Sequence, residues 1–218
     1  MVLIALGITS LAWGAVTWRW GDPVTGYYTK RVQTQLERDL EDRRQQFRSS
    51  TGSNRQTRVG PVATRPRLDL RREAARYRTT LGEGDAVGRL VVPRLGLTVV
   101  LVFGTDSRTL RKGPGIHAST GLPGQGGLIY VAGHRTTYLA PFAHIDRLRA
   151  GDTATIELPY GSFRYRVTGT RIVDDDDLSV LAPTAMETLR LQACHPRFRA
   201  TQRIVVSARL VRATEAAA

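Results

Sequence analysis

The chain has 218 residues, with 32 Lys and Arg against 19 Asp and Glu, and its formal net charge is +13. Its single cysteine excludes an intramolecular disulfide framework and any zinc site built from several cysteines. The hydrophobic fraction of 41% excludes wholesale disorder, while the positive charge favours an anionic neighbour such as nucleic acid, a membrane surface or a cell-wall polymer.

The N-terminal segment is apolar. Residues 2–18 carry no charged side chain, and a helix of about 17–20 residues just crosses the hydrocarbon core of a bilayer. Trp13, Trp18 and Trp20 follow one another at its C-terminal end, as in an aromatic belt. Because a basic start and a small-residue cleavage site are missing, we expect residues 1–20 to be an uncleaved transmembrane anchor. The basic residues all follow it, which by the positive-inside tendency would keep that side in the cytoplasm.

A strongly charged segment follows over residues 21–82. Between residues 19 and 80, fifteen Lys or Arg side chains stand against seven Asp or Glu side chains, so this part carries +8 of the net charge. Such a segment is either a solvated linker or a surface attracted to an anionic membrane or wall polymer. We expect it to form a charged stalk, part helical and part flexible, between the anchor and a folded domain.

One stretch of the stalk has the spacing of a helix. Four apolar residues recur close to one helical stripe, which predicts a charged amphipathic helix over residues 25–48. The Ser-, Thr- and Gly-rich sequence over residues 49–66 predicts a flexible connection. The stripe consists of Val32, Leu36, Leu40 and Phe47.

The folded domain is expected over residues 83–213, with 214–218 as a short tail. Apolar, β-branched runs recur there between Gly- and Pro-rich turns, and residues 141–148 predict one helical turn or a short helix. Short strands with few helices predict an all-β domain, either a closed or nearly closed barrel or a sandwich. About 130 residues bury roughly two thirds of their unfolded surface, enough for a stable core. The expected strands are 89–93, 97–104, 127–133, 153–158, 162–173, 187–194 and 203–212.

The cysteine lies where a strand is expected to end. Cys194 closes an apolar run and is followed by His195 and Pro196, so its thiol is expected at the rim of the domain. A cysteine in an apolar strand is more often a packing residue, but reactive thiolates need partial exposure and nearby positive charge. Arg203 opens the next expected strand, and its guanidinium can donate to a developing oxyanion.

One histidine also follows an expected strand. His134 comes directly after Gly133, and it is either a turn residue or a general acid and base. Three other histidines compete with it. His117 lies in a turn-like sequence, His144 lies in an amphipathic turn, and His195 is poorly aimed at the thiol because adjacent strand residues point to opposite faces.

These three residues together resemble the sortase family. A strand ending in Gly-His, a later strand ending in Cys, and an Arg nine positions after that Cys form the sortase pattern. Residues 88–106, 113–135 and 188–206 carry the resemblance, and GHRTTYLAPFAHIDRLRAGD is most like the class E sortases of actinobacteria. The resemblance implies a closed β-barrel of about eight strands with short helices, preceded by a transmembrane helix and a charged stalk.

The resemblance also implies an activity and a location. Sortases are membrane-anchored cysteine transpeptidases outside Gram-positive cells. By resemblance, Cys194 is the nucleophile, His134 the general acid and base, and Arg203 the stabiliser of oxyanion or substrate. The expected substrates are surface proteins with a C-terminal LAxTG- or LPxTG-type sorting motif, cleaved between Thr and Gly, and the acceptor is a peptidoglycan precursor amine. We expect no metal and no cofactor. The resemblance implies that the catalytic domain lies outside the cytoplasmic membrane, which is opposite to the orientation that the basic residues after the apolar segment favour.

Two features stand apart from the family pattern. Most members have Thr before the catalytic cysteine, whereas this chain has Ala193, so a hydroxyl available for substrate contact or for orienting the site is missing. The acidic run over residues 174–177 is either a solvated loop or a calcium-binding loop like that of some sortases. Four consecutive aspartates are not a specific coordination pattern, because alternate side chains diverge.

Other readings of the sequence remain. An L,D-type transpeptidase would have Ser-His-Gly before its cysteine, where this chain has Leu191, Gln192 and Ala193. A papain-like hydrolase would place its cysteine at a helix N-terminus. A catalytically inactive sortase-like barrel that binds wall or membrane polymer would explain the anchor, the stalk and the charge. Nucleic-acid binding is not expected, because the basic excess lies mostly in the stalk and no reader motif is present.

Overall fold

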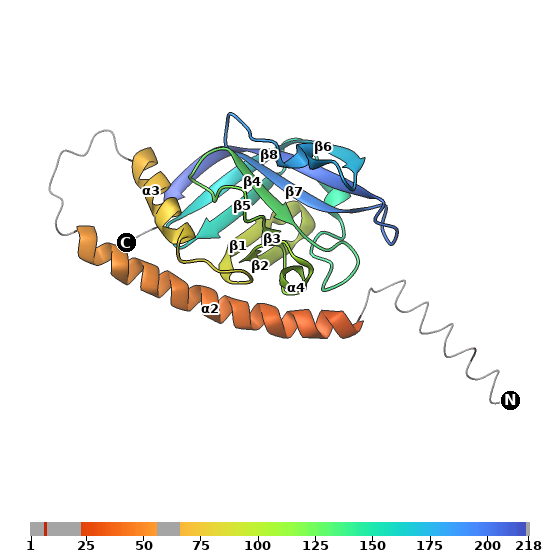
Figure 1. Ribbon diagram of the computed structural model, residues 1–218, viewed down its shortest axis with the longest axis horizontal. Coiled ribbons are helices and arrows are strands. Elements are labelled where there is room, and N and C mark those ends of the chain that lie inside the picture. The colour runs from red at the N-terminus through yellow and green to blue at the C-terminus, as the bar shows by residue number, and fades with distance from the viewer. Residues whose placement is uncertain (1–6, 8–22, 56–65, 217–218) are drawn as a thin grey trace.

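Eight strands wind into a barrel, and two longer helices lie on its outside (Figure 1). The computed structural model describes residues 7, 23–55 and 66–216. The helices are α2 (Pro23–Arg55), α3 (Pro66–Arg78) and α4 (Ser107–Leu110), and the 3-10 turns are η1 (Pro93–Leu95), η2 (Ile145–Arg147) and η3 (Leu178–Leu181). The strands are β1 (Ala86–Val92), β2 (Leu97–Phe103), β3 (Gly115–Ile116), β4 (Leu128–Ala132), β5 (Thr153–Leu158), β6 (Gly161–Asp174), β7 (Thr188–His195) and β8 (Gln202–Glu215).

The barrel closes in the order β1-β2-β3-β4-β7-β8-β6-β5. Neighbouring strands are antiparallel except for two parallel pairs, β2 with β3 and β4 with β7. Side chains alternate between the apolar interior and the outside, so Leu189, Leu191 and Ala193 of β7 are buried in the core while the residues between them face outward. The β4–β7 pair joins segments about 60 residues apart in the chain.

The sequence predicted most of these strands. All seven expected runs correspond to strands, and the expected helical turn within residues 141–148 is η2. Of the barrel and sandwich alternatives, the closed barrel is the one observed. The sequence missed β3, because a strand of two residues is too short to show alternation.

The helix expected over residues 25–48 is α2, and its apolar stripe lies against the barrel (Figure 1). Leu36 and Leu40 pack with Ala86, Val100 and Val102 on the outside of β1 and β2. The helix continues to Arg55, so the flexible connection expected from residue 49 is wrong for residues 49–55. The rest of that connection, residues 56–65, lies outside the described part of the chain.

Polar contacts fix α2 in place. The Gln33 amide accepts from the Val100 N–H (2.8 Å) and donates to the Val100 carbonyl (3.2 Å), as a neighbouring strand would. Glu37 pairs with Arg89 on β1 at 2.5 Å, and Arg43 pairs with Asp85 at 2.5 Å. Where it is described, the charged segment is therefore a docked helix, and the reading of it as a solvated linker does not hold there.

A second helix of this segment, α3, was not expected. Leu70, Ala74 and Tyr77 on α3 are buried with the barrel core, and the Tyr77 hydroxyl donates to the Val87 carbonyl at 2.8 Å. The ring of Phe47 from α2 lies edge-on to the ring of Tyr77, with 5.5 Å between the ring centroids. Both helices thus complete the core at one side of the barrel.

The expected membrane anchor, residues 1–20, lies outside the described residues except for Gly7. Within the described segments, no helix combines the length and the apolar character that a bilayer crossing requires.

Candidate active site

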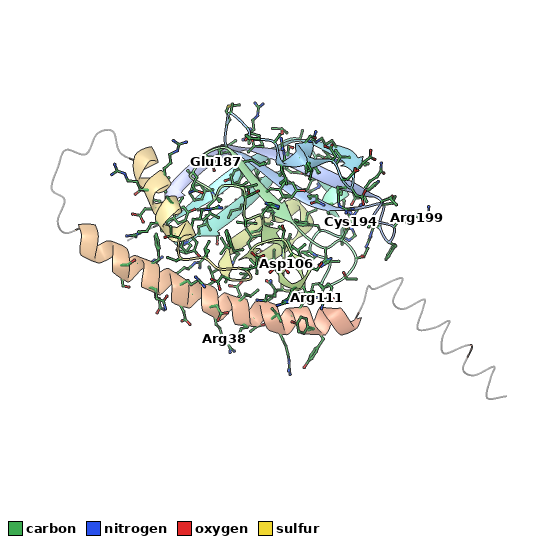
Figure 2. All side chains as sticks on the ribbon, viewed as in Figure 1. Arg38, Asp106, Arg111, Glu187, Cys194 and Arg199 are labelled. Carbon is green, nitrogen blue, oxygen red and sulfur yellow. The ribbon has the colours of Figure 1, made fainter. Side chains whose placement is uncertain are left out.

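Cys194 and Arg203 are direct partners in the antiparallel ladder between β7 and β8. Their neighbours Ala193 and Ile204 are also paired and lie in the barrel core. Because strand residues alternate between faces, both Cys194 and Arg203 point to the outer face. The thiol is partly exposed. Figure 2 shows Cys194 near the end of the barrel from which the β7–β8 connection extends, with Arg199 on that connection.

The parallel pairing of β4 with β7 brings His134 to the same place. Ala132 lies opposite Gln192, and the Gly133 N–H donates to the Gln192 carbonyl at 3.0 Å, which extends the ladder by one step. His134 and Cys194 each lie two residues beyond the Ala132–Gln192 pair. The structure therefore brings the three expected site residues to one end of three neighbouring strands, β4, β7 and β8.

His134 is held in a half-buried position that favours its neutral form. Burial lowers the pKa of the imidazole, and the nearby positive charge of Arg111 lowers it further. Its Nε2 atom is buried and has no hydrogen-bond partner among the described side chains and backbone groups. The Tyr138 ring lies against it, with 4.9 Å between the ring centroids. A neutral imidazole has one ring nitrogen that can accept a proton, which a general base requires.

The turn after β4 fixes the position of His134. A Cβ atom at Gly133 would lie 2.7 Å from the ring of buried Phe142, so only glycine fits there. The Phe142 N–H donates back to the His134 carbonyl at 3.0 Å. Tyr138, Leu139 and the following alanine adopt positive φ angles of 51°, 61° and 42°, a region that costs side-chain-bearing residues about 1–2 kcal/mol each.

Arg203 is partly tied down by the chain around it. Its Nη1 donates to the carbonyls of Ala200 (2.7 Å) and Gln202 (2.9 Å), and its Nη2 lies 3.8 Å from an Asp175 carboxylate oxygen. The side chain keeps 25% of its surface exposed. A permanently charged guanidinium beside a thiol, anchored through one nitrogen, is suited to donate to an oxyanion.

Two further residues of the site were not singled out by the sequence. The Tyr130 hydroxyl on β4 donates to the Gln192 side chain on β7, on the same outer face as Cys194. Burial raises the pKa of Tyr130 to about 12, although the charge of Arg203 acts in the opposite direction. Both residues were within the segments that resemble sortases, but nothing in the sequence pairs a tyrosine with a glutamine 62 positions away.

The β6–β7 connection closes one side of this face. Val180 of η3 packs on Tyr130 and on Val205 of β8. Arg190, whose side chain faces outward from β7, donates to the Val180 carbonyl at 2.5 Å. These contacts hold η3 beside the candidate site.

The acidic run 174–177 begins at the end of β6. Asp177 caps η3 by accepting from the Ser179 N–H at 2.8 Å, and hydrogen bonding from the Ser179 side chain and then from its backbone lowers the pKa of Asp177. Asp175 faces Arg203. In the described part of the chain, no group of three or more His, Cys, Asp or Glu side chains is arranged to hold a metal ion.

The other expected features lie as follows. Ala193 is 1% exposed with its side chain in the core, so a threonine here would place its hydroxyl in the barrel interior rather than toward a substrate on the outer face. His117 follows β3 and its Nδ1 contacts Ser119, while His144 is exposed. His195 follows Cys194 and its Nδ1 contacts Arg135.

The barrel domain is similar to known proteins. The family model described as the sortase domain matches residues 90–211. Among curated proteins, Sortase D of Bacillus subtilis is 36% identical over 114 residues, covering 52% of this chain and 56% of that protein. Sortase SrtE1 of Streptomyces coelicolor is 27% identical over 146 residues, covering 60% of this chain and 41% of that protein. The chain thus spans about half the length of the curated relatives it matches.

Solved structures share the fold. Sortase E from Streptomyces avermitilis has a TM-score of 0.56 and 31% identity, covering 62% of this chain and 93% of that one. The SrtA sortase from Actinomyces oris has a TM-score of 0.57 and 27% identity, covering 62% and 84%. A closed eight-stranded barrel with a cysteine, an arginine and a histidine at one end defines the class as sortase-like. With the match to the family model over more than half its length, this chain belongs to the sortase family.

Proposed function

We propose that this protein is a cysteine transpeptidase that cleaves a C-terminal sorting motif of the LAxTG or LPxTG type between Thr and Gly. The observation that carries the proposal is the pairing of Cys194 with Arg203 in the β7–β8 ladder, with His134 two residues after the end of the neighbouring strand β4. These are a nucleophile, a cation and a titratable base on one face. Family membership supports the same chemistry.

The first half of the reaction forms a thioester. The Cys194 thiolate attacks the carbonyl carbon of the motif threonine, and Arg203 donates to the oxygen on which negative charge develops. As the tetrahedral intermediate collapses, the C–N bond to glycine breaks. The leaving amine takes a proton from protonated His134, which leaves a neutral imidazole.

The second half transfers the acyl group. Neutral His134, the form that its environment favours, accepts a proton from an incoming amine. The amine attacks the thioester carbonyl, a new amide bond forms, and Cys194 leaves as a thiolate. A peptidoglycan precursor is the proposed source of this amine, and a surface protein carrying the sorting motif is the proposed donor.

Sortases belong to the cell envelope, and we place this chain there with its barrel outside the cytoplasmic membrane. The apolar residues 1–20 would form the anchor. Protease treatment of intact protoplasts tests this orientation, because an outward barrel is digested. A barrel that stays protected until the cells are lysed would rule the orientation out.

The transpeptidase proposal is tested by mass spectrometry of the enzyme with a panel of LAxTG and LPxTG peptides. We expect a thioacyl adduct on Cys194 that is absent from Cys194→Ala and that is discharged by an added amine. Arg199 is an exposed residue on the connection between β7 and β8 and provides a matched control, so Arg199→Gln should form the adduct normally. A wild-type chain that forms no adduct and releases no product with any peptide would favour the inactive, polymer-binding barrel.

A further inference from the structure

Arg135, the residue directly after His134, is buried although it is charged. Only 4% of its side-chain surface is exposed. Its Nη1 donates to the Cys194 carbonyl at 3.3 Å and to Nδ1 of His195 at 2.9 Å. Its Nη2 lies 3.0 Å from a carboxylate oxygen of Asp146 in η2. One guanidinium therefore joins three segments, namely the turn after β4, the end of β7 and η2.

These contacts require a planar side chain that donates hydrogen bonds in more than one direction. A guanidinium has only donors, so Nδ1 of His195 must accept and cannot carry a proton while the contact is made. The planar fork of the side chain allows two nitrogens to reach partners in different directions, which a lysine ammonium on its flexible stem cannot reproduce. Asp146 balances the buried charge. Burial raises its pKa, but hydrogen bonding and the charge of Arg135 outweigh this and hold the pKa below its usual range.

The position of this link matters because both reactive groups lie at strand ends. His134 lies two residues beyond the last residue of β4, and Cys194 is the last residue but one of β7. Near the end of a strand, the hydrogen bonds of the sheet no longer hold the backbone on both sides of a residue. Arg135 directly follows the proposed base, His134, and its side chain bonds to the backbone carbonyl of the proposed nucleophile, Cys194. Errors of about 1 Å between reacting groups can cost about 100-fold in rate.

We propose that Arg135 is a positioning residue that sets the distance between the Cys194 thiol and the His134 imidazole. Arg135 itself touches neither the thiol nor the substrate in this role. It acts by holding the Cys194 carbonyl and the His195 ring against the turn that carries His134. The proposal rests on the transpeptidase function proposed above, and the test separates the two.

The test compares Arg135→Met, Arg135→Lys and Asp146→Asn with Arg149→Met, which changes an exposed arginine after η2. Two quantities are measured: kcat and KM with a sorting peptide, and the rate at which iodoacetamide alkylates Cys194 across pH. We expect Arg135→Met to lower kcat about 100-fold with KM changed less than about threefold, because binding is retained and alignment is lost. The pH profile of alkylation should shift, since the thiol loses its fixed relation to His134.

The other variants sharpen this test. Arg135→Lys should recover part of kcat, and Asp146→Asn should lower it in the same direction by less. If Arg135→Met fails to fold, Asp146→Asn, whose residue is half-exposed, carries the test alone. A folded Arg135→Met with wild-type kcat and an unchanged alkylation profile overturns the proposal, as does an equal loss in Arg149→Met. Two results separate the positioning role of Arg135 from the transpeptidase function. Activity in Cys194→Ala would refute the transpeptidase proposal, whereas the alkylation profile of Cys194 reports on Arg135 without any turnover.

Discussion

Cys194 lies directly opposite Arg203 in the β7–β8 ladder. Directly opposed residues in an antiparallel pair have Cα atoms about 4.5–5.5 Å apart and side chains on one face. If either strand slipped by one residue, its outward side chain, Cys194 on β7 or Arg203 on β8, would turn into the apolar core that holds Ala193 and Ile204. The buried side of the barrel therefore fixes the relation between thiol and guanidinium on the outer side.

Replacing Arg203 should impair catalysis more than stability. Loss of one donor to a developing oxyanion costs about 100- to 1000-fold in kcat, so we expect Arg203→Ala to fall in that range. Arg203→Lys keeps the charge but not the fork that bonds the Ala200 and Gln202 carbonyls, and should recover only part of the rate. Peptide-cleavage kinetics with a thermal melt of each variant provide the measurement. An Arg203→Ala protein with wild-type kcat would contradict the assigned role.

The charge of Arg111 should be visible in the titration of His134. Burial lowers the pKa of this imidazole and Arg111 lowers it further, so removing the charge must raise it. We expect Arg111→Gln to raise the pKa of His134, because a nearby positive charge disfavours the imidazolium form. NMR titration of the imidazole measures this. Arg108→Gln changes an exposed arginine on α4, the short helix that Arg111 caps at its C-terminal end, and should leave the pKa of His134 unchanged. A lower pKa of His134 in the Arg111→Gln protein would contradict the expected effect of the Arg111 charge.

Gly133 should tolerate no side chain. A Cβ atom there meets the Phe142 ring at 2.7 Å, and the ring is fully buried. Overpacking of this kind costs about 1–3 kcal/mol, and it would displace the turn that carries His134. We therefore expect Gly133→Ala to lower both the free energy of unfolding and kcat. Gly169→Ala on β6, where a Cβ would meet nothing within 4 Å, is the matched control for denaturant unfolding. Equal stability of the two variants would argue against this packing.

The docking of α2 can be measured as stability. Leu40 is fully buried between the helix and the barrel, so Leu40→Ala should lower the free energy of unfolding by about 2–5 kcal/mol. A free stalk helix would contribute almost nothing to the unfolding of the barrel. Arg38, which Figure 2 shows on the side of α2 away from the barrel, provides the control Arg38→Ala. If both substitutions left the unfolding transition of the barrel unchanged, the helix would not be docked in solution.

The site residues were predicted from the sequence because each one follows a local signal. Cys194 and His134 come at the ends of apolar runs, and Arg203 opens the run that follows the cysteine. That the structure brings all three to one end of the barrel agrees with the resemblance to sortases, while their catalytic roles remain proposals. Arg135 had no such signal, because its burial depends on Asp146, Cys194 and the ring of His195.

The charged N-terminal region was the less predictable part. The stripe of Leu36 and Leu40 predicted a helix, but a helix with one narrow apolar stripe can face solvent, a membrane or a domain. The helix lies against the barrel because Gln33 hydrogen-bonds the Val100 backbone and Glu37 forms an ion pair with Arg89. These contacts join residues more than 50 positions apart. The helix α3 was missed because its many arginines obscured the three buried residues that face the core.

The sequence by itself determined the β-rich class and seven of the eight strands, and it indicated the three residues to which the proposed chemistry is assigned. Those features are encoded by local periodicity and by residue type, which one chain displays directly. The tertiary structure decided the closure of the barrel, the parallel pairing of β4 with β7, the docking of α2 and the buried position of Arg135. Each of these depends on contacts between distant segments, whose free energy exists only when the partners are already in place. The single cysteine gains its positively charged neighbour in the same way, since Arg203 reaches it only through the register of two strands.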